Sequence, residues 1–119
     1  MTTGARGEGY LELDGERYAV LFTLQALGDA EQFTGKTIMQ LMAAAQANAM
    51  GVGDLAQMLA VGLERARREH KTRVRAYDVN DAWRLLDGLG FTIVLVVVLE
   101  ALAAVMSFRP GAEGSDPQT

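Results

Sequence analysis

The spacing of apolar residues changes once within residues 10–40, and this change limits the folds that the chain can adopt. From Tyr10 to Leu13 apolar and polar residues alternate, and Asp14-Gly15 is a strong signal for a tight hairpin turn. Tyr18 and the next two apolar positions of the same parity share one face of the returning strand. At Thr23-Leu24 the spacing becomes helical. The sequence therefore predicts a β-hairpin that leads almost directly into a helical body.

Short signals at helix ends divide this helical body. Gly35 follows the first helical stretch, where a residue with positive φ is usually needed, and Thr37 begins a capping box with a glutamine three residues later. Asp54 and Asp78 are candidate N-caps of two further helices, and Phe91 to Ser107 forms the last one. The expected fold class is mainly α with a short N-terminal β-hairpin (α+β), a small helical domain of four to five helices.

The 119 residues suffice for one domain with a modest core, and half of them are apolar. We expect a single domain over residues 10–108, with the β-hairpin at 10–24 and the helical body at 24–108. A flexible leader over residues 1–9 and a flexible acidic tail over residues 109–119 are expected on either side. In the helix after Asp54, Leu55, Met58 and Leu59 share one face with Gly62, which we expect to let a neighbouring helix come close.

Composition argues against several function classes. The net charge of −4 is unlike that of a dedicated nucleic-acid binder. With no cysteine and with His70 as the single histidine, a zinc site is close to excluded. The tripeptide Gly35-Lys36-Thr37 resembles the end of a phosphate-binding loop, but the chain has Ala30 where that loop needs a glycine. We therefore expect no catalytic, metal-binding or cofactor-binding residue, no cofactor and no enzymatic activity.

Positive charge is concentrated in residues 64–75, which hold six Arg or Lys against two Glu. This stretch lacks interleaved aromatic residues, so a protein-facing or solvated surface is the better interpretation than contact with nucleic acid. Cations near a helix C-terminus also complement the helix dipole. The hypothesis for this basic belt is that it steers an acidic partner, and its residues are Arg65, Arg67, Arg68 and Lys71.

The last helix, Phe91 to Ser107, is apolar all round in its first half, which is unusual for a surface helix. It has three explanations. It is the central helix of the domain, or it has one face in the core and one face for a partner or a second copy, or it spans a membrane. Glu100 lies inside it, which counts against a membrane span. The apolar residues opposite the expected core face, Ile93, Val96 and Val97, are the candidate surface for a partner.

Three segments together resemble a known family. DGERYAVLFTLQALGDAEQFTGKTIMQLM resembles the opening of the tail assembly chaperones of long-tailed phages (siphophages), particularly the group found in gene transfer agents and their prophage relatives. DLAQMLAVGLERARRE and YDVNDAWRLLDGLGF resemble later parts of the same pattern. The likeness covers roughly residues 8–107, and it lies in the order and spacing of these segments.

The resemblance implies a function in viral tail assembly. Chaperones of this family bind the tape measure protein, keep its long apolar helices soluble, and recruit tail tube protein around it. They act in the host bacterial cytoplasm and are usually absent from the mature particle. The resemblance thus implies these two protein partners, and self-association into a homo-oligomer is a further expectation. Two alternatives stay open, a structural tail component such as a tube or terminator subunit, and a small membrane-anchored helical protein.

Overall fold

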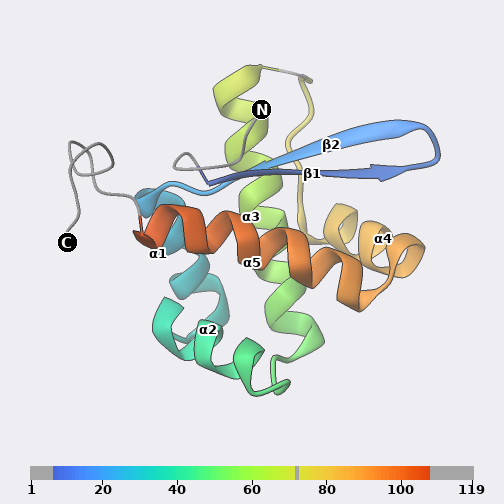
Figure 1. Cartoon of the computed structure of the whole chain (residues 1–119). Coiled ribbons are helices and arrows are strands. Elements are labelled where there is room, and N and C mark those ends of the chain that lie inside the picture. The colour runs from blue at the N-terminus through green and yellow to red at the C-terminus, as the bar shows by residue number, and fades with distance from the viewer. Residues whose placement is uncertain (1–6, 72, 108–119) are drawn as a thin grey trace, which may run out of the picture.

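The computed structural model describes residues 7–71 and 73–107 (Figure 1). The described residues form a two-stranded sheet and five helices, which confirms the expected mainly α fold with an N-terminal hairpin. The elements in chain order are β1 (Glu8–Leu13), β2 (Glu16–Leu21), α1 (Leu24–Thr34), α2 (Ile38–Gln46), α3 (Val52–His70), α4 (Val79–Leu89) and α5 (Phe91–Ser107).

The hairpin forms where the turn signal predicts it. Strands β1 and β2 pair antiparallel from Leu13↔Glu16 outward, and both turn residues, Asp14 and Gly15, have positive φ (54° and 79°). This backbone conformation suits the twist of a two-residue hairpin loop. β1 begins at Glu8, so the expected leader is too long by two residues. Its residues 1–6, and the expected tail over residues 109–119, lie outside the described residues.

The capping signals locate most helix starts. Thr37 forms the predicted capping box, and Asp78 is the predicted N-cap and forms a complete capping box with Asp81 as well. Asp54 is not an N-cap, because α3 begins two residues earlier with Gly51 as its cap. The Asp54 carboxylate instead lies 2.9 Å from the Lys36 amine. A carboxylate anywhere in the first helical turn interacts favourably with the helix dipole. An acidic residue can therefore lie at several positions near the helix start, and it locates the first residue less well than a cap does.

Helix α3 is the central helix of the fold. It packs against β2, α1, α4 and α5, and in Figure 1 it stands behind both the hairpin and α5. Its long apolar face is buried along most of its length, and the buried residues are Leu55, Ala56, Met58, Leu59, Val61, Gly62, Leu63 and Ala66. The explanation that made the last helix central is therefore wrong.

Helix α5 has one buried face and one exposed face. Val94, Val98 and Leu102 are fully buried, whereas Ile93 is 54% and Val96 is 47% exposed. The second explanation places one face in the core, as observed, and its other part, a face for a partner or a second copy, stays a prediction. Among the described helices, none combines the length and the apolar character that crossing a membrane requires.

Gly62 allows a close approach, but of Val20 in β2 and of Phe22 directly after it, and not of a helix. A Cβ at Gly62 would lie 2.8 Å from Cζ of Phe22 and 3.2 Å from Cβ of Val20. Both of these side chains are buried and have little room to move. The end of β2 therefore packs directly on the backbone of α3.

We expect Gly62→Ala to lower the free energy of unfolding by about 1 to 2 kcal/mol, because overpacking outweighs the gain of about 1 kcal/mol in helix propensity. Gly28 is the matched control, since a Cβ there would meet no atom within 4 Å. Gly28→Ala is expected to raise stability by about 0.5 to 1 kcal/mol. Urea denaturation followed by circular dichroism measures both, and an increase for both variants would contradict the packing argument.

Candidate functional site

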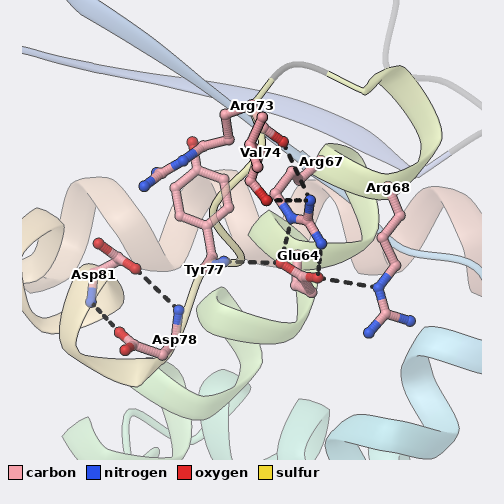
Figure 2. A network of polar contacts seen from close by, with 8 residues as sticks. All are labelled: Glu64, Arg67, Arg68, Arg73, Val74, Tyr77, Asp78 and Asp81. Carbon is pink, nitrogen blue, oxygen red and sulfur yellow. Dashed lines mark hydrogen bonds and ion pairs between the residues drawn. The ribbon is translucent and has the colours of Figure 1, made fainter.

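Glu64 is the centre of a polar network at the junction of α3 and α4 (Figure 2). Its carboxylate accepts hydrogen bonds from Nε and Nη2 of Arg67, at 2.9 and 2.6 Å, and from Nε of Arg68 at 3.0 Å. It also accepts the backbone N–H of Tyr77 at 2.8 Å. Charge-assisted bonds of this kind are stronger than neutral ones. One carboxylate thus connects the C-terminal half of α3 to the chain segment that precedes α4.

Arg67 extends the network to the connector, residues 73–77. Its Nη1 donates to the carbonyl oxygens of Arg73 and Val74, each at 3.2 Å. The guanidinium of Arg73 in turn lies over the ring of Tyr77, 4.2 Å from its centroid. Arg67 therefore makes its contacts within the chain, and its guanidinium is not free to pair with a partner.

Hydrogen bonds and ion pairs near the connector lower the pKa of two carboxyl groups, those of Glu64 and Asp81. The Arg67 hydrogen bonds lower the pKa of Glu64 to about 2, against the opposing effect of burial, and the Tyr77 N–H and Arg68 add to the decrease. Burial also opposes ionisation of Asp81, but the backbone N–H of Asp78 and the Arg75 side chain hold its pKa below the ordinary value. Both groups are ionised throughout the neutral range.

A second set of contacts joins the connector to the hairpin. The rings of Tyr18 and Tyr77 meet edge to face with centroids 6.4 Å apart. The Tyr18 hydroxyl accepts from Arg84 and donates to Glu16, both at 3.0 Å. The alternation of β2 predicts that Tyr18 points inward. Two of its partners, Tyr77 and Arg84, are 59 and 66 residues away, and no local pattern in the sequence identifies them.

Beside this network lies a groove with a volume of about 590 Å³, which we call the α1–α3 groove. This size is typical of protein binding sites. Its lining comes from α1, α3 and the start of α4, and comprises Asp29, Gln32, Phe33, Gln57, Ala60, Val61, Glu64, Arg65, Arg68, Tyr77, Asp78 and Val79. The lining thus combines apolar residues with polar and charged ones.

Phe33 is the most unusual lining residue, because a phenylalanine that is 66% exposed gains little from the core of its own domain. Ala60 and Val79 are partly buried and Val61 is buried, so together they provide a shallow apolar surface. Arg65 lines the same groove, and its side chain takes part in none of the hydrogen bonds or ion pairs between side chains of the described residues. The groove therefore offers an exposed aromatic ring and a free guanidinium, beside the carboxylates of Asp29, Glu64 and Asp78.

The basic belt divides into groups with different surroundings. Arg65 and Arg68 line the α1–α3 groove. Lys71 ends α3 in the left-handed conformation, with φ of 55°, and lies outside that groove. His70 lines a smaller hollow of about 390 Å³ beside the hairpin, and its Nε2 lies 4.0 Å from a carboxylate oxygen of Glu8. Within the described ranges, no group of three or more His, Cys, Asp or Glu could hold a metal ion.

The exposed face of α5 forms a second candidate surface. Ile93, Val96 and Glu100 follow one another at helical spacing on this face, and we call them the α5 stripe. Val97 lies beside the stripe, but it is half-buried and close to the backbone of Gly9 in β1. Two of the three residues predicted from the sequence, Ile93 and Val96, are thus exposed, whereas packing on the hairpin leaves Val97 half-buried.

The α5 stripe and the α1–α3 groove are separate surfaces. Helix α5 lies in front of α3 in Figure 1, whereas in Figure 2 the network around Glu64 lies in front of α5. No residue of α5 lines the groove.

Comparison of the chain with protein-family models, with curated proteins and with solved structures finds no match, so the likeness to tail assembly chaperones stays a prediction.

Proposed function

We propose that this protein is an assembly chaperone that holds a long amphipathic helix of a client protein in the α1–α3 groove. The observation that carries the proposal is the combination of an exposed phenylalanine, a shallow apolar surface and an unpaired arginine in one groove. Helices of this kind are commonly recognised by laying their apolar face in such a groove. The sequence resemblance supplies the identity of the client, which is the tape measure protein of a phage tail.

Each part of the groove has a role in this proposal. Phe33 and Val61 contact the apolar face of the client helix, and Arg65 pairs with an acidic residue beside that face. The Glu64 network keeps the end of α3 and the connector in place, and thereby positions Arg65 and Tyr77 along the groove. Recruitment of tail tube protein, action in the host cytoplasm and absence from the mature particle are the further parts of the proposal that the resemblance implies.

The alternative function, a structural tail component, implies a different architecture. Tube and terminator subunits are typically dominated by β-structure, so the single two-stranded sheet among the described residues favours the chaperone over that alternative.

The test is co-expression with a tape measure protein of the long-tailed phage type, followed by affinity capture and light scattering. We expect a soluble stoichiometric complex, and a tape measure protein that is insoluble when expressed alone.

Phe33→Ala is expected to weaken binding at least about tenfold, as truncation of an aromatic residue at an interface does. Leu24→Ala on the same helix is the matched control, because Leu24 is 72% exposed and lies outside the groove.

Two results would contradict the proposal. A tape measure protein that is soluble alone and not captured would remove the chaperone function. Equal binding by Phe33→Ala, Leu24→Ala and the unchanged chain would remove the groove as the client site.

A further inference from the structure

The charged side chains of the α1–α3 groove differ in whether the chain itself already binds them. They are Asp29, Glu64, Arg65, Arg68 and Asp78. Glu64 and Arg68 pair with each other, at 3.0 Å between a carboxylate oxygen and Nε. The Asp78 carboxylate accepts the backbone N–H of Asp81 at 3.2 Å, as the cap of α4. These three charges therefore have partners within the chain.

Asp29 and Arg65 are the charges that remain. Asp29 is exposed on α1, and Arg65 is half-buried on α3. Neither side chain takes part in a hydrogen bond or an ion pair with another side chain of the described residues, and the two are not paired with each other. The groove thus has a free carboxylate on its α1 side and a free guanidinium on its α3 side.

Each free charge lies next to an apolar residue of the groove. Asp29 precedes Phe33 by one helical turn in α1, and Val61 precedes Arg65 by one helical turn in α3. Residues at this spacing share a helix face. A helix that lays its apolar face on Phe33 and Val61 therefore brings one flank of that face beside Asp29 and the other flank beside Arg65.

We propose that the α1–α3 groove selects an amphipathic helix of mixed charge, with a basic residue on one flank of its apolar face and an acidic residue on the other. The basic residue pairs with Asp29 and the acidic residue pairs with Arg65. This inference rests on the proposed function, because it states which helices the groove accepts.

The same two residues disfavour helices whose flanks carry a single sign of charge. A helix with acidic residues on both flanks pairs with Arg65 but places a carboxylate beside Asp29. A helix with basic residues on both flanks places a cation beside Arg65. Repulsion of like charges thus adds to the discrimination that the attractive pairs provide. Because turning a helix end for end exchanges its flanks, the charges also select the direction in which a mixed-charge helix lies.

The experiment uses synthetic helical peptides that share an apolar face of leucine and alanine and differ only in their flanks. One peptide has Glu along one flank and Lys along the other, and the others have Glu, Lys or Gln on both flanks. Each peptide carries a fluorophore and is kept too dilute to pair with itself, and the full chain is titrated while fluorescence anisotropy reports binding. We expect the mixed-charge peptide to bind about three- to tenfold more tightly than either singly charged peptide.

Charge reversal is expected to change which peptide binds best. Asp29→Arg makes both sides of the groove positive and should favour the peptide with Glu on both flanks. Arg65→Glu makes both sides negative and should favour the peptide with Lys on both flanks. The variant with both substitutions should again prefer the mixed-charge peptide, which then lies in the opposite direction.

Matched controls change the net charge by the same amounts outside the groove. Asp87→Arg and Lys71→Glu alter exposed residues that are not part of the lining, and both variants should keep the preference of the unchanged chain. Circular dichroism checks that all variants are folded. A control that shifts the preference as much as Asp29→Arg or Arg65→Glu would show that the total charge of the chain decides binding, and the inference would be wrong.

The remaining outcomes separate this inference from the proposed function. Equal binding of all peptides, weakened throughout by Phe33→Ala, would remove the charge selection and leave the groove as a helix site. Binding of no peptide together with capture of the tape measure protein would overturn the inference and leave the chaperone function. Selection of the mixed-charge peptide without capture of the tape measure protein would leave the inference and remove the proposed client. Binding of neither would remove both.

Discussion

Replacing Phe22 with alanine is expected to lower the free energy of unfolding by about 3 to 5 kcal/mol. Phe22 follows β2 directly, is completely buried, and its ring reaches the backbone of α3 at Gly62. Because α3 covers its other side, the cavity left by the ring cannot collapse without moving the central helix. A domain of this size has a total stability of about 5 to 15 kcal/mol, so the variant loses a large share of it.

Phe33→Ala is the matched control for this prediction, because it removes the same ring from an exposed position on α1. We expect its stability to stay within about 0.5 kcal/mol of the unchanged chain, while its client binding is weakened. Urea denaturation followed by circular dichroism measures both variants. An equal loss of stability for Phe22→Ala and Phe33→Ala would contradict the assignment of one ring to the core and the other to the groove.

Glu64→Gln is expected to lower the free energy of unfolding at neutral pH by about 2 kcal/mol. The decrease of its pKa from 4.5 to about 2 corresponds to at most about 3 kcal/mol. The side chain is 18% exposed and Arg68 is mostly exposed, so solvent screening reduces this amount. The substitution also leaves Arg67 without its carboxylate partner and weakens its hold on the connector.

The pKa of Glu64 also predicts how stability depends on pH. Its folded pKa lies below the unfolded value, so its contribution is fully present above pH 4.5 and is lost as the pH falls toward about 2. The difference between the unchanged chain and Glu64→Gln should therefore shrink from about pH 7 to about pH 3. Glu69→Gln is the control, since Glu69 is exposed on the same helix. A difference that stays constant with pH would show that the carboxylate charge has no part in stability.

The sequence by itself determined the elements of this protein and many of their ends. The Asp14-Gly15 turn, the capping boxes of Thr37 and Asp78, and the limits of α5 all follow from interactions within four residues along the chain. Such interactions are visible in the sequence because both partners are close together in it. For the same reason the sequence locates Arg65, Ile93 and Val96 on helix surfaces, although it does not tell which partner each surface meets.

The tertiary structure alone decided which surfaces are free. The network of Glu64 and Arg67 makes Arg67 a contact within the chain and leaves Arg65 unpaired, although the two arginines are alike in the sequence. Packing on β1 covers Val97 and leaves Val96 exposed. These outcomes depend on contacts between residues far apart in the chain. A helix pattern states only that a face is apolar, and burial of that face depends on which distant elements pack against it.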